Sequence, residues 1–197
     1  YYDFVPLPGN RLAIALADVS GKGISAALMM AKFSGNTRYC ILTENEPAPA
    51  MTILNDQLCE AGLDERFITM SLSVLNLDTG RLTLCSAGHL PILIRRANGQ
   101  VEEHGADISG LPLGIMSHFP YQQVEVQLEP GDVVVVYSDG ITDARSPQDE
   151  LYHTVDSPRL NRRLAELSGD PEAVGRAILQ EIREFSTGEP QADDMTL

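Results

Sequence analysis

The amino-acid sequence predicts an α+β fold in a single domain, with antiparallel sheets packed together and amphipathic helices outside them. The middle third of the chain alternates apolar and polar residues, as half-buried strands do, and the first and last thirds carry apolar residues at helical spacing. No repeat or low-complexity linker divides the 197 residues. A chain of this length buries about 70% of the surface that its unfolded form exposes, which is enough for one core.

The first third predicts one strand followed by two helices. Apolar residues alternate with alanines over residues 12–16, and this strand runs into Asp18. A turn with two glycines at 20–23 precedes a helix-prone stretch, 24–33, rich in Ala, Leu and Met. A second helix begins near Pro47. Its apolar face consists of Met51, Leu54 and Leu58.

The middle third predicts a series of short strands separated by turns. They cover residues 68–74, 82–84, 92–94, 124–128 and 133–136. Asp78-Thr79-Gly80 and Asn98-Gly99 are hairpin turn sequences, and Pro130-Gly131 is a third turn. The last of these strands is a continuous apolar run, which indicates a strand buried on both faces.

The last third returns to helical spacing. One apolar stripe comprises Leu160, Leu164 and Leu167. Asp170 followed by Pro171 is a helix N-cap with proline at the first helical position. The longer helix that begins there has an apolar face formed by Val174, Ile178, Ile182 and Phe185.

Composition excludes several classes of function. The formal charge of −14 and the lack of a basic stripe argue against nucleic acid and anionic membranes as partners. No apolar run approaches the roughly 20 residues of a membrane span, so no membrane insertion is expected in this segment. Cys40, Cys59 and Cys85 have no metal-ligand spacing and lie in apolar or mixed segments. Small buried thiols of this kind fit a reducing, cytoplasmic location.

Acidic residues recur at the edges of the predicted apolar strands. Asp18 ends the first strand, Asp139 follows the valine run, and Asp193 and Asp194 stand where a final strand should begin. Each has glycine or another small residue nearby, which lets the backbone approach a ligand closely. Aspartate beside glycine is also a common turn pair, so for each residue taken alone a turn is the favoured interpretation. Together, without His or Cys, they suit hard cations such as Mg²⁺ or Mn²⁺.

Six short motifs occur in an order that resembles a known family. They are Asp18-Val19-Ser20-Gly21-Lys22-Gly23, Ser86-Ala87-Gly88-His89, Gly110-Leu111-Pro112-Leu113-Gly114, Leu128-Glu129-Pro130-Gly131-Asp132, Tyr137-Ser138-Asp139-Gly140 and Asp193-Asp194-Met195-Thr196. This order is similar to that of PPM (protein phosphatase 2C-like) phosphatases, and most similar to the bacterial SpoIIE-like branch that regulates sigma factors and sporulation. The resemblance covers nearly the whole chain. It implies a β-sandwich of two antiparallel sheets flanked by helices.

The resemblance also implies a metal-dependent serine/threonine protein phosphatase with two divalent cations, Mn²⁺ or Mg²⁺. Asp18 would bridge the cations and the Val19 carbonyl would bind one of them, while Asp139 and Asp193 would each bind metal. Asp194 is the weaker ligand candidate, because the family's aspartate stands two residues before the methionine. The catalytic set is therefore Asp18, Asp139 and Asp193. Two such cations activate a water for attack on phosphorus and offset the phosphate charge.

The resemblance implies more about the surroundings of this domain. Residues 1–197 would be a PPM-type catalytic domain truncated at both ends, since the family has a further metal-site aspartate just before the tyrosine pair. An upstream sensory or regulatory domain would precede it, and helices between residues 24 and 59 would transmit its signal. The substrate would be a phosphorylated bacterial regulatory protein such as an anti-anti-sigma factor. A homodimer is compatible with the sequence.

Alternatives remain open from the residues themselves. His89 suits a general acid for the serine leaving group, but a structural histidine at a strand-end turn is the favoured interpretation. Leu28, Met51 and Leu54 fit ordinary core positions as well as a signalling role. For function, a catalytically silent phosphatase-like binding module and a small-molecule phosphatase are the rivals. Retention of the three aspartates argues against the binding module, which has no need of them.

Overall fold

The computed structural model describes residues 1–21, 23–62, 66–191 and 193–197. Contacts divide the chain into two compact units. The first unit comprises Tyr1–Pro91 and Gly105–Leu128, and the second comprises Ile92–His104 and Glu129–Leu197. The two units are therefore described one at a time.

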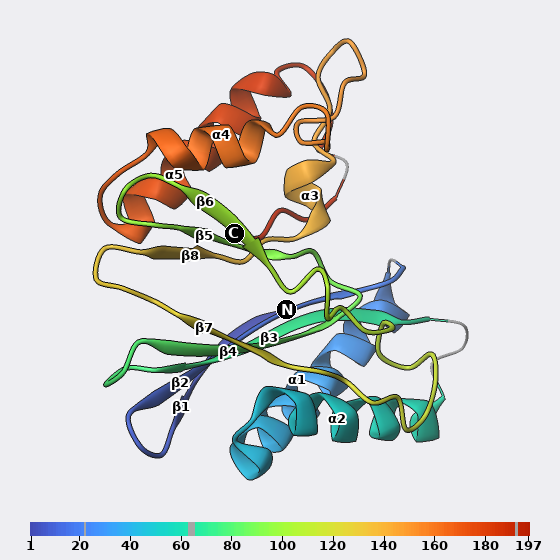
Figure 1. Cartoon of the computed structure of the whole chain (residues 1–197). Coiled ribbons are helices and arrows are strands. Elements are labelled where there is room, and N and C mark those ends of the chain that lie inside the picture. Colours follow the sequence, from blue (N-terminus) through green and yellow to red (C-terminus); the bar gives the residue numbers. More distant parts are fainter. Residues whose placement is uncertain (22, 63–65, 192) are drawn as a thin grey trace. The chain divides into compact units, whose positions relative to one another are not determined.

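The first unit is built on a five-stranded antiparallel sheet (Figure 1). Its strands are β1 (Tyr2–Leu7), β2 (Arg11–Val19), β3 (Ile68–Asn76), β4 (Arg81–Ala87) and β7 (Val124–Gln127), in the spatial order β1-β2-β3-β4-β7. Strand β2 pairs with β3 along its whole length, from Arg11 opposite Asn76 to Val19 opposite Ile68. This pairing fixes which residues of the two strands face the same side.

Two helices, α1 (Ile24–Glu44) and α2 (Pro47–Ala61), cover one face of this sheet (Figure 1). Alternate residues of β2 and β3 point into the core beneath them, where Phe33 and Met51 are fully buried. The predicted apolar face of α2 is confirmed, because Met51, Leu54 and Leu58 are all buried. Helix α1 continues eleven residues past the predicted end, which was 33 and is Glu44.

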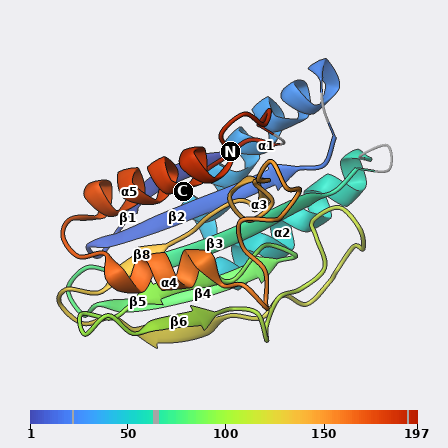
Figure 2. The same cartoon turned by 90° about the horizontal axis from the view of Figure 1, so that it is seen from above.

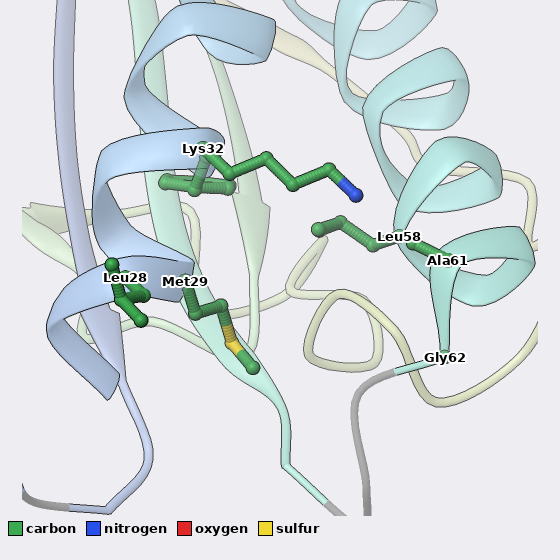
Figure 3. Close-up of a pocket in the computed structure, with 7 residues that line it drawn as sticks. Leu28, Met29, Lys32, Leu58, Ala61 and Gly62 are labelled. Carbon is green, nitrogen blue, oxygen red and sulfur yellow. The ribbon is translucent and has the colours of Figure 1, made fainter. Parts of the chain in front are cut away.

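The start of α1 departs from the core pattern. Leu28 is 68% exposed, so the interpretation of this residue as ordinary core is wrong. It borders a hollow of about 250 Å³ between α1 and α2, in which Lys32 extends toward Leu58 (Figure 3). The residues that line the hollow are Leu28, Met29, Lys32, Phe33, Leu58, Ala61 and Gly62.

The second unit contains a three-stranded antiparallel sheet in the order β6-β5-β8. Its elements are β5 (Ile92–Arg95), β6 (Val101–His104), β8 (Val133–Val135), α3 (Asp139–Thr142), α4 (Arg159–Glu166) and α5 (Pro171–Phe185). Helix α4 contacts β5 and β6, and it runs beside α5 (Figure 2). Leu160 and Leu164 are buried, and the Asp170 side chain caps α5 by accepting the Ala173 N–H at 2.9 Å, as predicted.

The Glu129–Asp132 turn holds this smaller sheet together. The Asp132 carboxylate accepts hydrogen bonds from the Glu129 and Ala97 N–H groups, each at 3.0 Å, and pairs with Arg96 at 2.8 Å. Burial alone would raise the pKa of Asp132, but these hydrogen bonds and the guanidinium together lower it. The aspartate of this motif is thus a structural residue that joins the turn to the end of β5.

Two predicted strands are corrected by the structure. Residues 193–197 form no strand, although the Ser138 N–H donates a main-chain hydrogen bond to the Thr196 carbonyl at 3.0 Å. Strand β8 ends at Val135, and Val134 is partly exposed, so burial on both faces is wrong. The predicted 20–23 turn includes Lys22, which lies outside the described residues. The other predicted strands and helices are confirmed in type.

Helix length and the state of the cysteines can be described directly. Among the described residues, no helix combines the length and apolar character needed to cross a bilayer. All three cysteines are free thiols, with Cys40 and Cys85 buried and Cys59 half-buried.

Candidate active site

Asp18 is the penultimate residue of β2, in a position set by strand register. It lies opposite Thr69 of β3, and the preceding pair, Ala17 and Met70, points into the core under the helices. Because side chains alternate along a strand, Asp18 and Thr69 both point to the opposite face. Both residues are partly buried.

The chain that follows Asp18 is tied to the segment before β3. The Ser20 N–H donates to the Phe67 carbonyl at 3.0 Å, and the Phe67 N–H donates to Ser20 Oγ at 2.9 Å. Gly21 has a φ of +99°, which glycine adopts without strain. The sequence motif therefore shapes the backbone just past Asp18 and Val19.

His89 is held in a defined position on the first unit. Its Nδ1 lies 2.9 Å from the Thr69 hydroxyl, and its carbonyl accepts a hydrogen bond from the Ser86 hydroxyl at 3.2 Å. The residue is 8% exposed. Gly88, with a φ of +64°, makes the turn, and a side chain there would come within 2.6 Å of Pro112 Cγ. The prediction of a structural histidine at a strand-end turn agrees with this geometry.

The Gly110–Gly114 segment packs along the same end of the sheet. Its Gly110 N–H donates to the Ser86 carbonyl at 2.9 Å, and Leu113 exchanges two main-chain hydrogen bonds with Ile68. Asn55 of α2, fully buried, fixes the end of this segment: its Oδ1 accepts the Gly114 N–H at 2.9 Å and its Nδ2 donates to the Met116 carbonyl at 2.8 Å. Sequence reasoning missed Asn55, whose one signal was a polar residue on an apolar helix face.

In the second unit, Asp139 is the first residue of the short helix α3 and does not end a strand. The C-terminal segment is anchored to Ser138 and Gly140, the residues on either side of Asp139. Ser138 Oγ donates to the Asp194 carbonyl and accepts the Thr196 N–H, both at 3.0 Å. A side chain at Gly140 would lie 2.3 Å from the Asp194 carbonyl oxygen. Glycine is therefore required for this close approach.

The acidic residues of the second unit repel one another. Burial, then the charges of Asp193 and Asp143, raise the pKa of Asp139, and two local N–H groups offset part of this. Asp193 and Asp194 are both exposed. Asp143, one helical turn after Asp139, was not predicted; the available signal was its i, i+4 spacing from Asp139.

The donor chemistry fits a hard divalent cation. Carboxylate and backbone oxygens are the ligands that Mg²⁺ and Mn²⁺ prefer. Burial is the main cause of the raised pKa of Asp139, and a cation would offset the second cause, the charges of Asp193 and Asp143. Within residues 1–21, 23–62, 66–191 and 193–197, no group of three or more His, Cys, Asp or Glu side chains is gathered that could hold a metal ion. The structure groups Asp139, Asp193 and Asp194 in the second unit, and it places Asp18 and Val19 in the first.

The sequence matches a known protein family over nearly its whole length. Residues 8–197 match the sequence profile of the family described as Stage II sporulation protein E (SpoIIE). The chain is 35% identical over 147 residues to the phosphoserine phosphatase RsbU of Bacillus subtilis, covering 74% of this chain and 43% of RsbU. It is 29% identical over 225 residues to protein IcfG of Synechocystis, covering all of this chain and 34% of IcfG. The chain thus spans less than half the length of these relatives.

Solved structures agree with these sequence matches. The PP2C phosphatase domain of SpoIIE from Bacillus subtilis superposes with a TM-score of 0.81 at 25% identity, covering 99% of this chain and 56% of that one. RsbX, solved in complex with magnesium, superposes with a TM-score of 0.67 at 16% identity, covering 99% and 82%. The fold is that of a PP2C-type phosphatase domain. The chain belongs to the SpoIIE family, and the predicted fold class is confirmed.

Proposed function

We propose that this chain hydrolyses phosphoserine or phosphothreonine on a bacterial regulatory protein, such as an anti-anti-sigma factor, with two Mn²⁺ or Mg²⁺ ions. The observation that carries the proposal is the match to the SpoIIE family over residues 8–197, which includes every predicted site residue. The 35% identity to a phosphoserine phosphatase supports phosphoserine as the substrate group. The formal net charge of −14 favours a protein as the partner and argues against a nucleic acid.

The proposed ligands are Asp18, the Val19 carbonyl, Asp139 and Asp193, with Asp194 as the weaker candidate. Divalent cations bound there would supply an activated water and would offset the charge of the phosphate. The chain's own contribution is to hold the carboxylates in place. Register with β3 fixes Asp18, and Ser138 and Gly140 fix the segment that carries Asp193. No residue of this site is a covalent nucleophile in the proposal.

The wider setting is also a proposal. We place residues 1–197 as the catalytic domain of a longer cytoplasmic protein, with an upstream sensory domain, and a homodimer is compatible with this arrangement. Support comes from the share of each relative that the chain covers, 43% of RsbU and 34% of IcfG. The exposed start of α1 and its hollow offer a surface through which such a domain could act.

Phosphate release from a phosphoserine protein tests the proposed activity. The full-length protein is assayed with and without Mn²⁺, beside Asp139→Asn and the matched control Asp149→Asn. Asp149 is an exposed aspartate of the same unit, paired with Arg145, and its φ of +62° suits asparagine. Release that requires Mn²⁺, persists in Asp149→Asn and is lost in Asp139→Asn is the expected result. Metal-independent release would overturn the proposal.

The same assay separates the two rival functions. A small-molecule phosphatase would cleave a small phosphoester at least as efficiently as the phosphoprotein. A silent binding module would release no phosphate, and its affinity for the partner would not depend on metal or on phosphorylation.

A further inference from the structure

Asp18, the proposed cation ligand of the first unit, has two polar residues nearby, Thr69 and His89, to which the proposed function assigns no role. Thr69 lies directly opposite Asp18 across the β2–β3 ladder, on the same face of the sheet. Directly opposed residues of antiparallel strands have Cβ atoms about 4.5–5.5 Å apart, so the two side chains are neighbours. The Thr69 hydroxyl therefore lies on the side of the sheet that carries the carboxylate proposed to bind metal.

The Thr69 hydroxyl is engaged by His89. The 2.9 Å contact between Thr69 Oγ1 and His89 Nδ1 occupies one donor or acceptor site of the hydroxyl. A hydroxyl has one proton and two lone pairs, so a ring N–H that donates to it leaves the threonine proton free to point toward another acceptor. The nearest acidic residue in the strand register is Asp18.

The histidine itself is fixed by its surroundings. Gly88 permits the turn, Ser86 binds the His89 carbonyl, and Ser86 in turn lies 3.1 Å from the Ser109 hydroxyl. A residue that is 8% exposed and bonded through Nδ1 to a threonine is poorly placed to reach a substrate leaving group. The position of His89 suits a residue that orients the Thr69 hydroxyl.

We propose that Thr69 and His89 are positioning residues: His89 fixes the Thr69 hydroxyl, which orients the Asp18 carboxylate for binding the divalent cations. This inference rests on the proposed function, because it takes Asp18 as a metal ligand. Groups that hydrogen-bond a metal ligand set its orientation, and their removal typically weakens metal binding about 10- to 100-fold. The role is therefore measurable as cation affinity, apart from turnover.

Calorimetric titration of Mn²⁺ into the full-length protein is the test, with a matched set of variants. Thr69→Val removes the hydroxyl and keeps the shape, Thr69→Ser keeps the hydroxyl, and His89→Leu removes the ring contact. Ser73→Ala is the control, because Ser73 lies on the same strand and the same face but opposite Ile14. Thermal unfolding of each variant without metal shows whether it is folded.

The expected result is a Kd for Mn²⁺ raised about 10- to 100-fold in Thr69→Val and His89→Leu. Thr69→Ser and Ser73→Ala should stay within about 3-fold of wild type. Saturating Mn²⁺ should restore most of the phosphate release of Thr69→Val, which a general loss of structure would not allow. If His89→Leu does not fold, the Thr69 pair still decides the question.

Two outcomes overturn the inference, and they differ in what else they affect. If the wild type binds Mn²⁺ and folded Thr69→Val binds it equally well, the positioning role is wrong and the proposed phosphatase stands. If the wild type neither binds Mn²⁺ nor releases phosphate, the proposed function fails and the inference fails with it.

Discussion

The two units present their aspartates in different ways. Asp18 is part of a long strand paired over its whole length, and the neighbouring segments are locked by Thr69, His89 and Asn55. Asp139 and Asp193 lie on one helical turn and on a segment without regular structure, joined mainly through Ser138 and Gly140. Secondary structure therefore positions the first aspartate, whereas a close backbone approach positions the others. Four substitutions test this contrast, from the largest expected effect to the smallest.

Gly140→Ala should strongly reduce activity although it removes no proposed ligand. The new Cβ would lie 2.3 Å from the Asp194 carbonyl oxygen, so the Asp193–Asp194 segment must move. Misplacement of a catalytic group by about 1 Å costs on the order of 100-fold, and phosphate release should fall by that amount. Gly80→Ala is the control, because its Cβ would meet the Leu128 carbonyl oxygen at 2.7 Å in a hairpin turn. Equal loss of activity in both variants would show that backbone approach at Gly140 has no special role.

Asn55→Ala should mainly reduce stability. The substitution removes the hydrogen bonds of a fully buried side chain to Gly114 and Met116 and leaves an empty space beside them. The free energy of unfolding should fall by about 2–3 kcal/mol. Chemical denaturation measures it, with Glu60→Ala on the exposed side of α2 as a control that should change by less than about 0.5 kcal/mol. A loss below 1 kcal/mol would mean that water replaces Asn55 on the Gly114–Met116 segment.

Ser138→Ala should have a smaller effect on stability than Asn55→Ala. It removes one hydrogen bond given to the Asp194 carbonyl and one taken from the Thr196 N–H. Since Asp194 is exposed, water can replace part of this, and a loss of about 1–2 kcal/mol is expected. Proteolysis of the C-terminal segment should become faster in the variant. A loss larger than that of Asn55→Ala would reverse the contrast between the two units.

Asp139→Asn should slightly stabilise the metal-free protein. The pKa of Asp139 is raised, so the folded state binds this proton more tightly than the unfolded state and ionisation works against folding. Stability is therefore lost as pH rises from the ordinary carboxyl pKa through the raised one. At pH 7 the variant should be more stable than wild type, by an amount that solvent screening reduces because Asp139 is exposed. At pH values well below the ordinary aspartate pKa, where the carboxyl is protonated in both states, the gain should vanish.

With Mn²⁺ added, the wild type should be more stable than Asp139→Asn. Binding to the folded state alone stabilises it, and the variant lacks one proposed ligand. Thermal unfolding with and without Mn²⁺ gives both comparisons. If Asp139→Asn is less stable than the wild type without metal, ionisation of Asp139 does not destabilise the folded state.

The sequence alone determined most of the secondary structure and the identity of the acidic residues. Alternation set the strands of the first unit, and with them the position of Asp18, because a residue two places along a strand always returns to the same face. Asp170 and Pro171 likewise fixed the start of α5 from a local hydrogen bond that needs no tertiary contact. The ordered motifs predicted the family that the comparison confirms.

Tertiary structure decided what depends on residues far apart in the chain. The segment after Asp193 resembles a strand in sequence, yet it is held by Ser138, 56 residues before Asp194, and forms no ladder. Leu28 looks like a core leucine, but it lies at the exposed start of α1. Thr69 and His89 gain their relation to Asp18 from strand pairing and from the turn at Gly88. The alternation of residues along a strand determines which face of the sheet a side chain occupies. The residue that it contacts on that face depends on which strand pairs with it in the folded chain.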